Sequence, residues 1–110
     1  MKFTIAVSAL AFATSTFAAS CARHTPAAVY EYEIIAEGVP NIPDVCGRLW
    51  NELSQFSSCV VGTSHSCEER APPNGRLRWV FSVGYGCDGG AVEAAWWDAT
   101  LNDYGAIDCP

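Results

Sequence analysis

Alternating apolar and polar side chains predict three β-strands. In residues 29–37 (VYEYEIIAE) and 76–84 (RLRWVFSVG), apolar side chains occupy every second position, as in strands with one buried face and one wet face. Residues 63–70 predict a weaker, more polar strand of the kind found at the edge of a sheet. The inward positions of the two strong strands are Tyr30, Tyr32, Ile34, Ala36, Leu77, Trp79, Phe81 and Val83.

Helical spacing of apolar residues predicts two helices, over residues 43–58 and 90–103. Pro43 at the first helical position and Asp44 beside it favour a helix that starts there. The apolar positions are Val45, Cys46, Leu49, Trp50, Leu53 and Phe56 in the first helix, and Val92, Ala95, Trp96 and Ala99 in the second.

The predicted order of elements is β-α-β-β-α, with at most a short final strand in residues 105–110. This order fits a two-layer α+β sandwich of the ferredoxin-like kind, with two helices on one face of an antiparallel sheet and the first and third strands as neighbours. We expect residues 20–28 to form a loose N-terminal arm that is held only by Cys21.

The first 19 residues have the layout of a secretory signal peptide. Lys2 supplies the positive start, an apolar stretch follows, and small residues close the segment, so we expect cleavage after Ala18 or Ala19. Too few apolar residues stand in a row for a membrane anchor. The sequence therefore predicts one exported domain, residues 20–110, in the extracellular space.

Six cysteines in a short exported chain predict three disulfides. Fifteen pairings are open in principle, and the predicted topology favours one of them. Cys21 and Cys109 meet at one end of the sheet, where the first helix and the third strand also end, and Cys46 can reach the edge strand. The sequence has no C-x-x-C pair, and we expect no metal and no cofactor. The favoured pairs are Cys21–Cys109, Cys46–Cys67 and Cys59–Cys87.

Charge limits the partners of the exported chain. Without the signal peptide it has no lysine, five arginines and twelve carboxylates, a net charge of −7 with histidine neutral. Such a surface repels phosphate backbones and anionic lipid headgroups. We therefore expect a monomer whose partner is a protein or a glycan, with no nucleic acid and no membrane insertion.

The stretch GYGCDGG, residues 84–90, matches the G-x-G-x-x-G pattern of dinucleotide-binding loops. A true loop of that kind needs an acidic residue about 20 positions on and a further strand, but only two residues follow Asp108. We interpret the stretch as a strand-to-helix turn in which Cys87 forms a disulfide and Asp88 caps the helix.

Catalysis by a small secreted ribonuclease is the enzymatic alternative. Glu31, Glu33 and Glu37 could act as acid–base groups, with Arg76, Arg78 and His65 on the same sheet to supply a histidine and cations. His65 stands in a serine-rich edge strand, where we expect an exposed histidine with no catalytic role. Cross-strand ion pairing explains the same glutamates and arginines without any chemistry. No residue is therefore assigned as catalytic.

Aromatic residues outside the predicted core are the candidates for partner binding. Trp97 follows Trp96, which already occupies the inward face of the second helix, and Trp97, Leu101 and Tyr104 form a second stripe. This stripe either covers the chain terminus or forms an exposed binding patch. Tyr85, in the turn before the helix, is a further candidate contact.

The whole exported chain resembles the small cysteine-rich secreted proteins of filamentous fungi, in particular effectors with the killer-toxin-like α/β fold. The resemblance rests on the strands VYEYEII and RLRWVFSV, the helices IPDVCGRLWNELSQF and GAVEAAWWDATL, and cysteines that close the elements. It implies virulence-related binding of a host or competitor target without catalysis or cofactor. A secreted antimicrobial or killer-type toxin is the alternative function, although a lysine-free acidic surface departs from membrane-active toxins.

Overall fold

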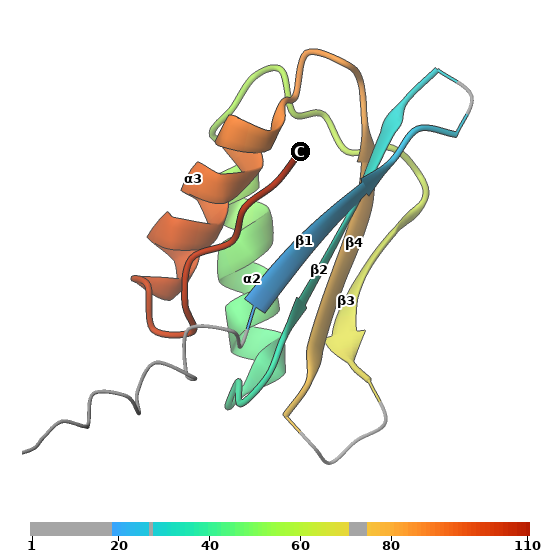
Figure 1. The fold of residues 1–110 in the computed structure, drawn as a ribbon. Coiled ribbons are helices and arrows are strands. Elements are labelled where there is room, and N and C mark those ends of the chain that lie inside the picture. The colour runs from blue at the N-terminus through green and yellow to red at the C-terminus, as the bar shows by residue number, and fades with distance from the viewer. Residues whose placement is uncertain (1–18, 27, 71–74) are drawn as a thin grey trace, which may run out of the picture.

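Two helices pack on one face of a four-stranded antiparallel sheet in the computed structural model, which describes residues 19–26, 28–70 and 75–110 (Figure 1). The strand order is β1-β2-β4-β3, so β2 and β4 are central neighbours, as predicted for the first and third strands. The two-layer α+β architecture is confirmed. The elements are β1 (Ala19–His24), β2 (Tyr30–Ala36), α2 (Ile42–Leu53), β3 (His65–Glu69), β4 (Leu77–Val83) and α3 (Gly89–Thr100).

The N-terminal arm was predicted wrongly, because its residues form strand β1. β1 pairs antiparallel with β2, with Cys21 opposite Ile34, and occupies the edge position that the last strand of a ferredoxin-like sheet would take. Residues 105–110 form no strand. The free edge of β2 explains β1, since pairing there satisfies backbone groups whatever the side chains are. The predicted signal peptide lies outside the described residues, except for Ala19.

Both helices end earlier than their apolar periodicity predicted. α2 stops at Leu53, after which the N–H groups of Phe56 and Cys59 donate to carbonyls three residues back in tight turns. α3 stops at Thr100 because Leu101 adopts a left-handed backbone with φ 53°. The apolar residues that follow each helix keep the helical spacing in the sequence, which made the predicted helices too long.

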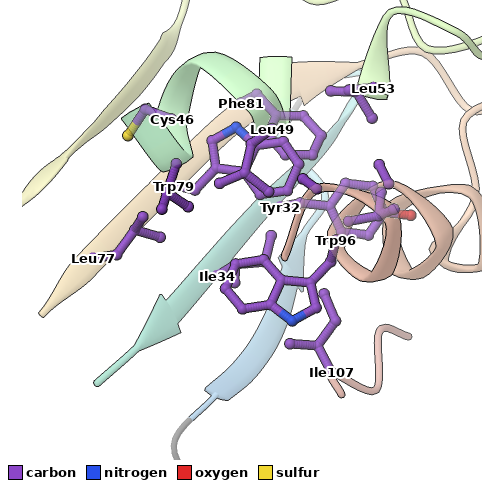
Figure 2. Packing of buried hydrophobic residues seen from close by; sticks show 14 of the residues in the cluster. Tyr32, Ile34, Cys46, Leu49, Leu53, Leu77, Trp79, Phe81, Trp96 and Ile107 are labelled. Carbon is purple, nitrogen blue, oxygen red and sulfur yellow. The ribbon is translucent and has the colours of Figure 1, made fainter. Parts of the chain in front are cut away.

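The core lies between the sheet and the helices, as Figure 2 shows. Tyr32, Trp79, Phe81 and Trp96 are fully buried, as their inward positions predicted. Trp50 and Phe56, also predicted to lie in the core, are partly buried and pack against it.

All three disulfides join the pairs predicted from the topology. Their Cα atoms lie 5.1 Å apart in Cys21–Cys109, 5.8 Å apart in Cys46–Cys67 and 4.7 Å apart in Cys59–Cys87. Cys46–Cys67 fastens α2 to the edge strand β3, and Cys59–Cys87 fastens the loop after α2 to the turn before α3. Cys21–Cys109 closes the longest loop and ties β1 to the C-terminal tail.

The tail, residues 105–110, runs back along α3 between that helix and β1 (Figure 1). The indole Nε1 of Trp96 donates to the carbonyl of Gly105 at 2.8 Å, and the Cys109 N–H donates to Glu93 at 2.7 Å. Ile107 between them is buried in the core. The tail therefore closes the helix layer on the β1 side.

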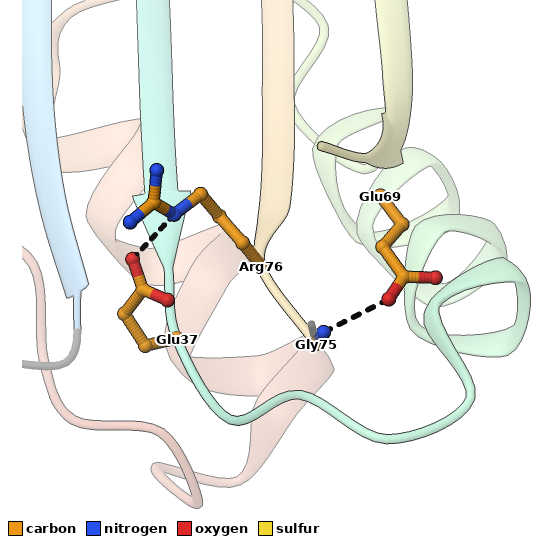
Figure 3. A network of polar contacts seen from close by, with 4 residues as sticks. All are labelled: Glu37, Glu69, Gly75 and Arg76. Atoms are coloured by element: carbon orange, nitrogen blue, oxygen red, sulfur yellow. Dashed lines mark hydrogen bonds and ion pairs between the residues drawn. The ribbon is translucent and has the colours of Figure 1, made fainter. Parts of the chain in front are cut away.

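Ion pairs cross the outer face and one end of the sheet. Arg78 Nε lies 2.7 Å from the Glu33 carboxylate, the cross-strand pairing that the sequence predicted. At the end of the sheet, Arg76 pairs with Glu37, and the Gly75 N–H donates to Glu69 at 2.8 Å (Figure 3). These contacts hold the start of β4 against the end of β2 and the end of β3.

Candidate functional site

The outer face of the sheet carries only part of the group considered for ribonuclease chemistry. Glu31 and Glu33 on β2 and Arg78 on β4 share this face, because their strands pair in register. His65 does not, since it stands opposite Phe81 on the face that the helices cover. The histidine that faces outward is His24, opposite Glu31 on the neighbouring strand β1.

His65 has a local structural role at the edge of the helix layer. Its Nδ1 lies 2.9 Å from the carbonyl oxygen of Gly62, and its ring meets the Trp50 ring edge-on with centroids 5.4 Å apart. His65 therefore shares the sheet with Glu31 and Glu33 but not their face, and it is exposed as expected. Its position in β3 was assigned correctly, but its register against β4 sends it to the other face.

The GYGCDGG stretch forms the turn between β4 and α3. Asp88 accepts a hydrogen bond from the Ala91 N–H at 3.1 Å, and Cys87 is joined to Cys59. The helix cap and the disulfide that the sequence predicted in this stretch are both present. Among the described residues, no group of three or more histidine, cysteine or acidic side chains is arranged to hold a metal ion.

Large apolar side chains are exposed at the C-terminal end of α3. Trp97 is 50% exposed and Leu101 is 71% exposed, whereas the neighbouring Trp96 is fully buried against the sheet. Leu101 directly follows the helix, and its N–H donates to the Trp97 carbonyl one turn back at 2.7 Å. We call Trp97 and Leu101, together with Asp98 between them, the α3 outer surface.

Tyr104, which the sequence grouped with Trp97 and Leu101, is not part of this exposed surface. It is partly buried and packs against the core, so the predicted stripe both covers the chain terminus, through Tyr104, and leaves Trp97 and Leu101 exposed. The left-handed turn at Leu101 and Asn102 causes the division, since it reverses the chain after α3 and turns Tyr104 inward.

Tyr85 lies at the other end of α3. Its ring packs on the Tyr30 ring with centroids 4.7 Å apart, and the Arg23 guanidinium lies 4.2 Å from the centroid of the same Tyr30 ring. Trp97 is eight residues into α3, about 12 Å along the helix axis from Gly89. Tyr85 and Trp97 therefore belong to two surfaces and not to one.

Next to this aromatic cluster, the buried Tyr32 hydroxyl donates to the Cys87 carbonyl at 3.2 Å. Burial raises the pKa of the Tyr32 hydroxyl, and the nearby Arg23 opposes the rise. A neutral phenol that holds the disulfide turn is a structural group. It offers no acid or base near neutral pH.

Two features of these surfaces were missed from the sequence. One is the Arg23 contact with Tyr30, which depends on β1 and was hidden in the presumed arm. The other is the left-handed backbone at Leu101. The later glycine, Gly105, offered a more obvious position for a helix-ending turn.

No protein-family model, curated protein or solved structure was found to match the chain. In the described part of the chain, neither helix is long and apolar enough to cross a membrane. Function therefore has to be inferred from the chain's own residues.

Proposed function

We propose that this chain is a secreted, disulfide-stabilised binding protein that recognises a partner through the α3 outer surface and acts without catalysis. The resemblance of its layout to fungal effectors supports a partner that belongs to a host or a competitor. Three disulfides in so small a domain agree with an oxidising, extracellular compartment.

The observation that carries the proposal is the difference in burial between the neighbouring residues Trp96 and Trp97. α3 is apolar around most of its circumference, a composition expected of a helix buried on all sides. The sheet and the tail cover other parts of its circumference, but Trp97 and the adjoining Leu101 remain in solvent. Tryptophan is strongly enriched among the residues that dominate binding energy at protein interfaces.

The α3 outer surface is preferred over the Tyr85 cluster. The Tyr85 ring already packs on Tyr30, so part of its apolar surface serves the fold. Trp97 belongs to a rigid helix whose ends are fixed by the Asp88 cap and by the tail. Sites on helices hold their geometry better than sites on turns.

Selection from a random peptide library tests the proposal. The oxidised protein is presented to phage-displayed peptides, and enriched peptides are counter-screened against Trp97→Ala. Peptides that bind the wild type and lose binding to Trp97→Ala are the expected result. Val60→Ala is the matched control, because Val60 is 75% exposed in the loop after α2.

Two results of the selection would contradict binding through the α3 outer surface. If enriched peptides bind wild type and Trp97→Ala alike, the α3 outer surface is not the binding site. Peptides that depend on Tyr85 and not on Trp97 would move the site to the other end of the helix. N-terminal sequencing of the protein secreted into the medium tests export separately, with Ser20 or Ala19 expected as the first residue.

A further inference from the structure

The last third of the chain has no positive side chain. From Trp79 to Pro110 there is no lysine, arginine or histidine, and all five arginines of the exported domain lie at or before Arg78. Every charged side chain on α3 and on the tail is therefore negative. The acidic residues of this segment are Asp88, Glu93, Asp98, Asp103 and Asp108.

Two of these carboxylates stabilise the fold, and two others lie beside the apolar surface. Asp88 caps α3, and Glu93 holds the tail through the Cys109 N–H. Asp98 and Asp103 are both exposed; Asp98 follows Trp97 in the last turn of α3, and Asp103 comes two residues after Leu101. The apolar part of the surface thus has an acidic border.

We infer that the partner of the α3 outer surface is a basic amphipathic segment of another protein, with apolar side chains flanked by lysine or arginine. This inference rests on the proposed function and names the chemistry of the partner. Apolar side chains would cover Trp97 and Leu101, while the flanking cations would meet Asp98 and Asp103. A cation over the exposed indole of Trp97 adds a further attraction, for which tryptophan is the best ring.

The negative charge of this surface also argues against three other kinds of partner. A second copy of this chain would bring another acidic border against the first, and like charges across an interface are unfavourable. Anionic lipid headgroups and nucleic acid phosphates would be repelled in the same way. A cationic protein segment is the macromolecular partner that such a surface attracts.

The backbone conformation of Leu101 is a second observation that supports a binding role for this surface. It adopts the left-handed backbone, in which any Cβ atom is unfavourable and glycine is the usual residue, yet its side chain gains little burial. Strain at an exposed apolar residue is consistent with a residue kept for contact with a partner. Leu101→Gly removes the side chain without opposing the backbone, so this variant is expected to fold.

Two synthetic peptides of about 14 residues, long enough for a marginal helix, test the partner's chemistry. Both have leucine at the same helical spacing, and their polar positions are all lysine in one and all glutamate in the other. Fluorescence anisotropy of each labelled peptide is measured against the oxidised wild-type protein at low and high salt. We expect the lysine peptide to bind, the glutamate peptide not to bind, and salt to weaken the binding.

Variants then locate the binding. Trp97→Ala is expected to weaken the lysine peptide roughly thirtyfold, as for a central interface residue, and Leu101→Gly at least several-fold without a lower melting temperature. Asp98→Asn should weaken binding several-fold at low salt only. Glu68→Gln is its matched control, because it makes the same change in charge at an exposed residue of β3.

Several results would overturn the inference. These are equal binding of the two peptides, equal effects of Asp98→Asn and Glu68→Gln, or binding that survives both Trp97→Ala and Leu101→Gly. A dimer in sedimentation analysis that Trp97→Ala abolishes would identify a second copy as the occupant. Trp97-dependent binding to vesicles of phosphatidylcholine and phosphatidylglycerol would identify a lipid surface instead.

The library selection separates this inference from the proposed function. Enriched peptides that require Trp97 but are neutral or acidic would refute the basic partner and leave the binding role intact. If no enriched peptide requires Trp97, both fail. Basic, leucine-rich sequences that require Trp97 support both.

Discussion

Trp79 and Trp96 are a matched pair that tests how much one hydrogen bond to the tail contributes. Both side chains are fully buried. The Nε1 of Trp96 donates to the Gly105 carbonyl at 2.8 Å, whereas the buried Nε1 of Trp79 has no hydrogen-bond partner among the described residues. Replacing each tryptophan by phenylalanine removes a similar part of a buried ring, so the packing losses largely cancel when the two variants are compared.

The difference between the variants follows from their N–H groups. Trp96→Phe loses a bond whose net contribution is about 0.5–1.5 kcal/mol, while Trp79→Phe removes a buried unsatisfied donor that costs about 1–3 kcal/mol. We therefore expect Trp96→Phe to lower the free energy of unfolding by about 1.5–4.5 kcal/mol more than Trp79→Phe does. Trp79→Phe alone should be mild for so large a buried residue.

Urea unfolding of the oxidised proteins at about pH 7, followed by far-ultraviolet circular dichroism, measures this difference without relying on tryptophan fluorescence. Linear extrapolation gives the free energy of each variant, and equal slopes show that the same surface unfolds. Equal destabilisation of the two variants, or a larger loss for Trp79→Phe, would refute a stabilising hydrogen bond between Trp96 and the tail. In the wild type, the indole N–H proton of Trp96 should also resonate downfield of that of Trp79.

Three further predictions concern the tail and the disulfide turn. Replacing Cys21 and Cys109 together by serine opens a loop with a sequence separation of 88, and loop entropy predicts a loss of about 4–5 kcal/mol in the free energy of unfolding by urea titration. Burial raises the pKa of Tyr32, so the unfolded chain releases this proton first, and the free energy of unfolding should fall as the pH rises above about 10. Tyr32→Phe should flatten that fall, and an unchanged slope would contradict the buried phenol. A Cβ at Gly89 would collide with the carbonyl oxygens of Cys109 and Pro110, so Gly89→Ala should cost about 1–3 kcal/mol and speed amide exchange at Cys109, unlike the control Gly90→Ala.

Strong alternation and topology made much of the fold predictable. β2 and β4 have large apolar side chains on one face, and their alternation also predicted which face holds Glu33 and Arg78. The assigned strand order brought certain cysteines close together, which favoured one of the fifteen pairings, and the structure has that set. The prediction worked where side-chain burial decides the structure.

It failed where backbone pairing or backbone conformation decides. The residues of β1, ASCARH, have no apolar alternation, and their strand exists because β2 offers an unpaired edge. His65 was assigned to the correct strand, but its face depends on a register that the polar sequence of β3 does not fix. The left-handed Leu101 divided the stripe that the spacing of Trp97, Leu101 and Tyr104 had suggested.

The position of the exposed residues is linked to the way this small domain is stabilised. A domain of this size has a small core, and disulfides supply stability that the core alone cannot. The Cys21–Cys109 disulfide fixes the tail, the tail fixes the end of α3 through Trp96, and α3 then presents Trp97 on a rigid support. Because cross-links stabilise the fold, it can tolerate an exposed tryptophan and a left-handed leucine, both unfavourable for an isolated domain. Trp97 and Leu101 are therefore the exposed apolar residues that we expect a partner to cover.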